Sequence, residues 1–338
     1  MKTLFITVYI LLAMTLCYGQ GIKTANYRTA PVTDTALVAV LSKFQLLIID
    51  MENGRNNHKV LELIKQKNPR LKLICYGNPA ERFYHPGNSR PIQTAWMTEI
   101  NKKYPNWVLK TNQGNDVVFF RGMHMLNMSA SCPKYNGQTY SDWMADRLLT
   151  EVLSDKIWDG YFGDECSGNW AWLYQGQEEG IDADKSGYRD DDAQLDESWA
   201  KGAYSFLKKI RQAKGSDFII ITNKGSLEFL DVVDGKMFEL FPNDYLGGKK
   251  DGGFWQCLAN GEQTGPFTIL QVKEKDINFG IASAALLDVY VAVGQDNSKW
   301  YPQFDLNLGQ GEETIITKTF KNGTIKIVPA KKEAVITK

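Results

Sequence analysis

Residues 156–170 read KIWDGYFGDECSGNW, and this stretch joins a short strand to an abrupt acidic end. The segment WDGYFG is typical of a buried strand, and the adjacent acids Asp164 and Glu165 follow it directly. Burying an unpaired carboxylate costs several kcal/mol, so two acids at the end of a strand are poor packing material. We therefore interpret this pair as groups that the fold holds in place for a chemical task.

Short apolar runs recur along the chain and alternate with helical patterns. Between the runs at 44–50 and 71–77, Val60, Leu61 and Ile64 fall on one face of a predicted helix. The remaining predicted strands are residues 123–128, 159–165, 218–223, 234–241, 266–272 and 289–293. Eight strands that alternate with helices predict the α/β class and a (β/α)8 TIM barrel. An open doubly wound sheet is the alternative, and the lack of a dinucleotide-binding glycine motif in the sequence disfavours it.

The last residues of the chain follow a different pattern. Residues 314–338 alternate in period two around an Asn-Gly turn, which predicts a β-hairpin or a small terminal sheet. We assign residues 20–308 to the barrel and residues 309–338 to a C-terminal β segment packed on the barrel.

Residues 1–19 have the pattern of a signal peptide. Lys2 precedes an apolar run at 4–16, and Gly19 offers a small residue for cleavage. We predict export of the chain to a secreted, periplasmic or extracellular location, with an uncleaved membrane anchor as the alternative. No second long apolar run follows in the sequence, so no membrane association beyond export is expected.

The composition narrows the classes of partner. The chain has 39 Lys and Arg against 39 Asp and Glu. This balance argues against a nucleic-acid partner, because nucleic-acid-binding proteins neutralise phosphates with excess basic residues. The four cysteines after the signal peptide show no metal-binding spacing, and neither do the three histidines. We therefore expect no required cofactor and no structural zinc.

Polar residues stand at the ends of most of the predicted strands. In a TIM barrel these ends meet at one mouth, where the active site lies. The residues concerned are Asp50, Tyr76, Asn78, Asn127, Asp164, Glu165, Asn223, Glu239 and Gln271, with Trp170 shortly after the fourth strand. Amides and acids bond hydroxyl groups and a Trp face stacks on a sugar ring, so such a mouth suits a carbohydrate. The alternative is that these are ordinary polar ends of barrel strands.

The stretch WDGYFGD at 158–164 also resembles the fourth-strand signature of several retaining glycosidases, in which the last acid is the key acid. The order of further motifs is similar to that of hypothetical glycosyl hydrolase family 15. These motifs are MLNM at 125–128, DWMADRLLTEVL at 142–153, MFEL at 237–240, FGIASAALL at 279–287 and FKNGTIKIVP at 320–329. The resemblance implies a barrel with a glycosidase-like site and aligns Asp164 with the key acid. Glu165 departs from the pattern, which often has an amide or a small residue there.

The resemblance implies a secreted glycoside hydrolase that cleaves a poly- or oligosaccharide with two carboxylates. By analogy with α-galactosidase-like barrels, Asp164 is expected to be the nucleophile and Glu239 the acid/base. The residues expected to bind substrate are Asp50, Tyr76, Asn78, Asn127, Glu165, Trp170 and Asn223. A catalytically silent barrel that binds glycans at the cell surface is the alternative function, and it does not require both carboxylates to face the mouth.

An acidic loop, DADKSGYRDDD at 182–192, places oxygen ligands at alternating positions. It resembles the first half of a calcium loop, with Asp182, Asp184, Ser186 and Asp190 as the side-chain ligands. The twelfth position is Ala193 where a calcium loop has Glu. We expect a structural calcium ion of weak affinity, with a solvated surface loop as the alternative.

Overall fold

The computed structural model describes residues 21–84, 87–243, 253–308, 316–320, 323–328 and 333–337. The predicted signal peptide lies outside these residues. The described residues divide into two compact units, one within residues 23–301 and one that combines residues 21–22 with the described residues after 301.

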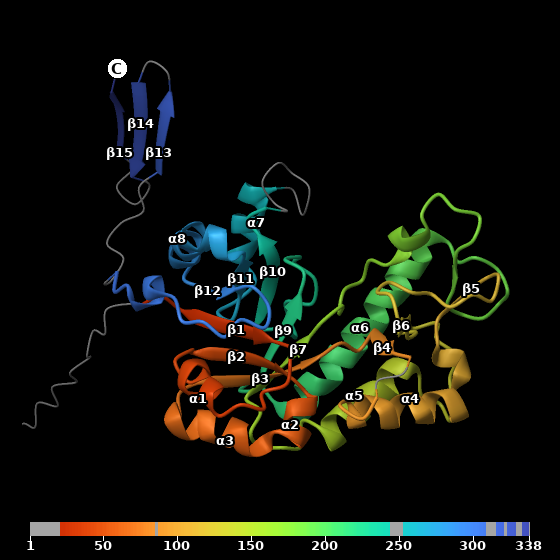
Figure 1. Cartoon of the computed structure of the whole chain (residues 1–338). Helices are drawn as coiled ribbons and strands as arrows, with labels where there is room; N and C mark the ends of the chain where they lie inside the picture. Colours follow the sequence, from red (N-terminus) through yellow and green to blue (C-terminus); the bar gives the residue numbers. More distant parts are fainter. Residues whose placement is uncertain are drawn as a thin grey trace, which may run out of the picture. The chain divides into compact units, whose positions relative to one another are not determined.

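The larger unit contains a closed barrel of eight parallel strands, so the predicted fold class is confirmed (Figure 1). Around the barrel the order is β1, β12, β11, β10, β9, β7, β3 and β2. The bounds are β1 Thr24–Arg28, β2 Leu46–Asp50, β3 Lys72–Gly77, β7 Gly160–Gly163, β9 Ile219–Asn223, β10 Gly235–Phe241, β11 Ile269–Val272 and β12 Tyr290–Val293.

Helices alternate with these strands along the chain. Their bounds are α1 Ala36–Leu41, α2 Glu52–Asn56, α3 His58–Lys67, α4 Pro91–Lys103, α5 Tyr140–Glu151, α6 Asp192–Lys214, α7 Phe254–Gly261 and α8 Ile277–Leu287. Short 3-10 helices are η1 Pro105–Trp107, η2 Ala171–Tyr174, η3 Glu274–Asp276 and η4 Pro302–Asp305. No helix in the described part of the chain is long and apolar enough to cross a membrane.

The barrel interior explains why several strands are apolar throughout. Leu46 and Ile48 of β2 point into the core, where they join Ile74 of β3 and Ile221 of β9. The intervening Leu47 is also fully buried, because a parallel barrel has helices on its outer face. Strands of this kind have continuous apolar sequences, which made β2, β3 and β9 easy to recognise.

The sequence prediction missed one barrel strand and assigned another wrongly. β1 was not predicted because its sequence, TANYR, has no apolar run, yet all five residues are buried. Its polar side chains bond to the chain after β12, where Asn26 donates to the carbonyl of Asn297 at 3.0 Å. Residues 123–128 were predicted as a barrel strand, but only β6 Met123–Met125 is extended, and it pairs outside the barrel with β4 Glu81–Phe83.

A lobe beside the barrel is formed mainly by the long connection between β3 and β7. It contains α4, α5 and the β4–β6 pair, and α6 runs alongside (Figure 1). A second two-stranded sheet joins β5 Lys110–Thr111 to β8 Ile181–Asp182. This lobe supplies residues to the barrel mouth that are distant in sequence from the strand ends.

The smaller unit contains an antiparallel sheet with the order β13, β14, β15. The bounds are β13 Ile316–Phe320, β14 Gly323–Val328 and β15 Glu333–Thr337. This is the region where the period-two pattern predicted a hairpin or a small sheet. The contact predicted between this segment and the barrel stays a prediction.

Three neighbouring barrel strands end in a residue with left-handed backbone. Glu165 follows β7 with φ 53°, Lys224 follows β9 with φ 69°, and Leu240 near the end of β10 has φ 57°. This conformation costs a non-glycine residue about 1–2 kcal/mol. Such strain persists where the surrounding structure fixes the backbone, and it concentrates at functional sites.

Side chains at the mouth hold this backbone in place. Asp164 Oδ1 accepts the N–H of Glu165 at 3.0 Å, and Asn223 Oδ1 accepts the N–H of Lys224 at 2.9 Å. The N–H of Leu240 donates to the side chain of Gln271 at 2.9 Å. The left-handed turns therefore bond directly to the polar groups at the strand ends.

Lys224 allows the backbone strain to be measured. Lys224→Gly and Lys224→Ala both remove the side chain, but only glycine adopts a positive φ without a Cβ clash. We expect Lys224→Gly to be more stable than Lys224→Ala by about 1 kcal/mol in urea unfolding.

The matched control is the same pair of substitutions at Lys201, which is exposed in the middle of α6. There glycine should be less stable than alanine by about 0.5–1 kcal/mol, because a helix interior disfavours glycine. If the alanine variant were the more stable one at position 224 as well as at position 201, the proposed backbone strain at Lys224 would be contradicted.

Candidate active site

The centre of the barrel mouth is a pair of carboxylates that share one amide. Asn223 Nδ2 donates to Asp164 Oδ1 at 3.0 Å and lies 3.2 Å from Glu239 Oε2. These two bonds together keep the two carboxylate oxygens within about 6 Å of each other. Asp164, Asn223 and Glu239 come from the carboxyl ends of β7, β9 and β10, which are neighbours in the barrel. The structure thus brings together three residues that the sequence placed at the mouth.

Two tyrosines approach this pair from the barrel interior. The hydroxyl of Tyr76 on β3 donates to Asp164 Oδ2 at 2.7 Å. The ring of Tyr27 on β1 lies 5.8 Å from that of Tyr76. Burial, followed by the charges of Asp164 and Glu239, raises the pKa of Tyr27. Tyr27 is therefore a neutral phenol near both carboxylates, and it was missed because its strand was not recognised.

Glu165, the second acid of the opening stretch, is half-buried beside Asp164. Burial and the charge of Asp164 raise the pKa of Glu165 to about 8, although the cation of Lys224 opposes the shift. Glu165 therefore carries its proton at neutral pH. Lys224 is held by a 2.7 Å bond from its Nζ to Ser167 Oγ.

Glu81 is a further carboxylate at the mouth that the sequence did not single out. It is buried on β4, where Oε1 accepts the N–H of Phe120 at 3.1 Å and Oε2 accepts Nδ2 of Asn78 at 3.3 Å. Burial raises the pKa of Glu81 to about 7, and the charge of Asp164 adds to the shift. The Asn-Pro pair at 78–79 after β3 was a turn signal that could have directed attention to this acid.

A cavity of about 170 Å³ opens beside Tyr76. Asp50, Asn78, Glu81 and Arg90 are among the residues that line it. Asp50 is buried and pairs with Arg90 at 3.2 Å, while its other oxygen accepts the N–H at position 52. Burial raises the pKa of Asp50, and Arg90 opposes the shift. Asp50 thus forms part of the wall of the cavity and fixes the turn after β2.

Two residues predicted to bind substrate are placed differently by the structure. Asn127 is fully buried, and its Nδ2 donates to the carbonyl of Ala183 at 2.6 Å, so its side chain supports a loop. It lies after β6, which is not a barrel strand. Trp170 is also fully buried, whereas Trp172 exposes 48% of its surface. A buried ring offers no face to a sugar, so Trp172 is the exposed tryptophan of this segment.

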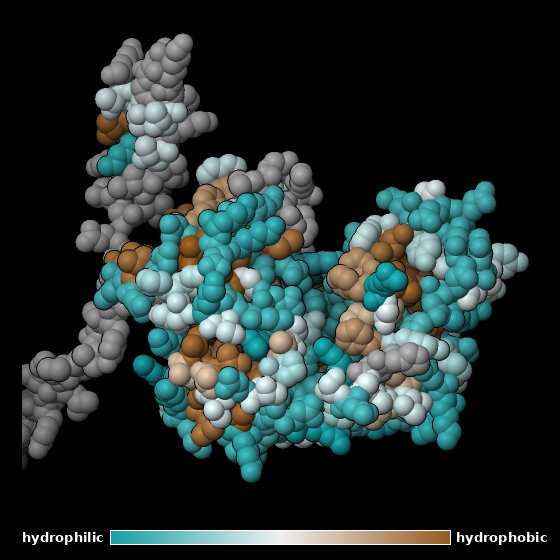
Figure 2. All heavy atoms as spheres, in the orientation of Figure 1, coloured by the Kyte–Doolittle hydropathy of each residue, from teal (hydrophilic) through white to brown (hydrophobic). Residues whose placement is uncertain are grey.

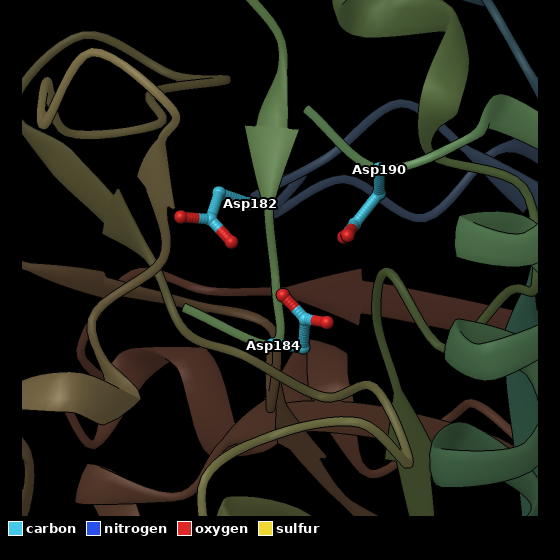
Figure 3. Close-up of side chains that lie close together, drawn as sticks. All are labelled: Asp182, Asp184 and Asp190. Atoms are coloured by element: carbon cyan, nitrogen blue, oxygen red, sulfur yellow. The ribbon is translucent and has the colours of Figure 1, made fainter. Parts of the chain in front are cut away.

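The acidic loop gathers three carboxylates. Ligand oxygens of Asp182, Asp184 and Asp190 lie within 4.8 Å of one another, and Figure 3 shows these side chains around a common space. Asp182 ends β8, and Asp190 precedes α6. Calcium prefers six to eight oxygen ligands, so this set would supply part of its coordination.

Backbone amides already satisfy several of these oxygens. The N–H of Ser186 donates to Asp182 Oδ1 and to Asp184 Oδ1 at 2.9 Å each, and the N–H of Gly187 donates to Asp182 Oδ2 at 3.0 Å. Burial and the neighbouring acids raise the pKa of Asp190, although the N–H of Ala183 opposes the shift. The residues fit a weak cation site that competes with these hydrogen bonds.

Calcium binding at this loop stays a prediction. Millimolar calcium should raise the melting temperature relative to chelator, because a ligand of the folded state stabilises it by mass action. The shift should disappear in Asp184→Ala and persist in Asp305→Ala, which removes an exposed acid elsewhere in the chain. No calcium-dependent shift in the unmodified protein would exclude the site, and a shift retained in Asp184→Ala would place the ion elsewhere.

Two solved structures resemble this chain at low sequence identity, and of these two the first has a TM-score that indicates a shared fold. The catalytic domain of β-amylase from Paenibacillus polymyxa is 7% identical, with a TM-score of 0.51, and covers 82% of this chain and 94% of its own. The maltogenic α-amylase AmyB from Thermotoga neapolitana is 9% identical, with a TM-score of 0.48, and covers 93% of this chain and 84% of its own. Identities this low compare the fold alone.

No curated protein sequence matches the chain. The sequence does match a family description over the region that contains the central carboxylates, Asn223 and Tyr76. Residues 65–323, more than half of the chain, match hypothetical glycosyl hydrolase family 15, and the chain belongs to this family.

Proposed function

We propose that this protein is a glycoside hydrolase that cleaves glycosidic bonds of a poly- or oligosaccharide with Asp164 and Glu239. The observation that carries the proposal is the separation of their oxygens, within about 6 Å, through the shared Asn223 amide. The pair lies at the end of the barrel where TIM-barrel enzymes act. Membership of a glycosyl hydrolase family supports the same reaction class.

We propose a retaining reaction, because the two hydrogen bonds of Asn223 allow Asp164 and Glu239 to lie at the shorter of the two known separations. Retaining enzymes hold their carboxyl groups about 5–5.5 Å apart, and inverting enzymes hold them about 6.5–9.5 Å apart to admit a water molecule. In the first step, an oxygen of Asp164 bonds to the anomeric carbon while the bond to the leaving oxygen breaks and Glu239 gives that oxygen a proton. In the second step, Glu239 takes a proton from water, and the water oxygen displaces Asp164.

The surroundings of Asp164 suit a nucleophile. Its Oδ2 accepts the Tyr76 hydroxyl, and its Oδ1 accepts the Asn223 amide and the N–H of Glu165. These hydrogen bonds fix the orientation of the carboxylate. The neutral Glu165 beside it avoids a second negative charge at the point of attack.

We also propose that the protein is exported. This rests on the signal-peptide pattern of residues 1–19. The measurement is the mass of the protein recovered outside the cytoplasm, which should lack about the first 19 residues. Recovery of the full-length chain only from the membrane fraction would favour an uncleaved anchor.

The general test is release of reducing ends from a panel of polysaccharides and aryl glycosides by the purified protein. Release from at least one substrate supports the proposal. Binding of a polysaccharide without any release would favour the alternative, a silent glycan-binding barrel.

Asp164→Asn should abolish turnover. The amide keeps the shape of the side chain but cannot form the glycosyl bond, so kcat should fall by several orders of magnitude. Binding of the same substrate should be largely retained. The matched control is Asp159→Asn, which makes the same change in the same stretch but at the opposite end of β7. A kcat near that of the unmodified enzyme would rule out the nucleophile.

Glu239→Gln should affect substrates according to their leaving group. A lost proton donor slows poor leaving groups most, whereas activated aryl glycosides need little protonation. The kcat for a natural saccharide should therefore fall at least about a hundredfold more than that for a dinitrophenyl glycoside.

Glu165→Gln serves as the comparison because Glu165 is the neighbouring acid that holds a proton at neutral pH. It should reduce both substrate types by similar factors. If Glu165→Gln shows the leaving-group dependence and Glu239→Gln does not, the proton donor is Glu165.

A further inference from the structure

The cavity beside Tyr76 is small for a polymeric ligand, and Asp164 and Glu239 are not among the residues that line it. Its volume of about 170 Å³ is below the roughly 300–1,000 Å³ of pockets that enclose a whole drug-sized ligand. If the substrate is a saccharide chain, most of its units must therefore lie outside this cavity. The surface next to the mouth then determines how the chain is held.

Exposed aromatic rings lie on the lobe beside the barrel. Phe119, Phe120 and Trp172 form a cluster that we name the aromatic platform. Phe120 exposes 53% of its surface and Trp172 exposes 48%. The rings of Phe119 and Trp172 meet edge to face, with centroids 5.7 Å apart and an interplanar angle of 90°. Phe119 and Phe120 also meet edge to face, at 4.4 Å.

The aromatic platform rests on buried rings. Trp170 lies beneath it, 6.4 Å from Trp172 in a stacked arrangement and 5.4 Å from Phe119. Trp199 of α6 supports Trp170 in turn, at 5.8 Å. Phe119 and Trp172 are therefore backed by the buried ring of Trp170, which restricts their movement.

Two connections join the aromatic platform to the mouth. The N–H of Phe120 donates to Glu81, which lines the cavity. The Nζ of Lys224 lies over the ring of Trp170, 4.9 Å from its centroid. Lys224 directly follows Asn223, whose amide joins the two central carboxylates. The aromatic platform is thus connected to the cavity through Glu81, and its buried support Trp170 is connected to the residue next to Asn223.

The surface around the aromatic platform is mixed in character. Figure 2 shows hydrophobic atoms gathered on the lobe that carries β4, β6 and α6, with hydrophilic atoms around them. Exposed aromatic surface in water is unfavourable, and a rigid patch of it beside a polar cavity marks a ligand-binding surface.

We propose that the aromatic platform is a carbohydrate subsite that holds sugar units of a neutral polysaccharide next to the cleavage point. This inference rests on the proposed function and specifies its substrate as a chain. A pyranose ring has an apolar face of C–H groups that stacks on an aromatic face, while its hydroxyls remain in water. Asp164 and Glu239 would repel an acidic sugar bound directly at the cleavage point, whereas a neutral sugar avoids this repulsion.

The test is affinity electrophoresis in native gels that contain soluble starch, glycol chitin, hydroxyethyl cellulose or galactomannan. Asp164→Asn serves as the parent, so that binding is measured without turnover. At least one polysaccharide should retard the parent, and adding Trp172→Ala should weaken that binding about tenfold. Phe120→Ala should weaken polysaccharide binding as well. This second variant tests the subsite independently if Trp172→Ala lowers the melting temperature.

The matched control is Tyr188→Ala, which removes an aromatic ring that is 78% exposed on the acidic loop. It should leave retardation unchanged. Equal retardation of the parent, Trp172→Ala and Phe120→Ala would overturn the subsite. Failure of all four polysaccharides to retard the parent would overturn it too.

Turnover by the unmodified enzyme separates this inference from the proposed function. Hydrolysis of a polysaccharide whose retardation does not depend on Trp172 would overturn the subsite and leave the function. Retardation that depends on Trp172 without any release of reducing ends would overturn the function and leave the subsite.

Discussion

The geometry of the active site depends on closure of the barrel by β1. This strand pairs in parallel with β2 on one side and with β12 on the other, so the strand ends form a ring. In an open sheet the same ends would lie along a line. Asp164, Asn223 and Glu239 come from strands that are neighbours in either arrangement, whereas closure brings Tyr27 of β1 near both carboxylates from across the ring.

Most of the barrel was predictable from the sequence, because its strands are buried on both faces. The runs that contain β2, β3 and β9 are apolar throughout, and such runs have few other uses in an α/β chain. β1 was not predictable in this way, since Nδ2 of Asn26 and Nη1 of Arg28 donate to carbonyl groups of a loop more than 260 residues later. Pairing over such a distance leaves no local pattern in the sequence. The segment around β6 shows the opposite case, because its apolar run predicted a barrel strand but the strand lies outside the barrel.

Prediction of the site residues also depended on whether local sequence or distant contacts determine their positions. Asp164, Asn223 and Glu239 were predictable because each stands at the end of a recognisable strand. Glu81 comes shortly after the end of β3, and the Asn-Pro pair at 78–79 was its only local signal, because the burial that raises its pKa comes from tertiary packing. The sequence also favoured Trp170 as the sugar-binding ring, but Trp170 is buried and Trp172 is exposed. Which of these two nearby tryptophans is covered depends on the packing of α6, and the local sequence does not show this packing.

The crowding of acids at the mouth has a consequence for the conditions that the fold tolerates. Glu165 binds its proton more tightly in the folded chain than in the unfolded chain, since its pKa rises from 4.5 to about 8. Between these values the folded state holds more protons, so the free energy of unfolding decreases as the pH rises. Burial acts on Glu81 in the same direction. Through these two groups the protein is more stable in mildly acidic surroundings than in neutral or alkaline ones, which couples the lifetime of the folded chain to the acidity of the medium.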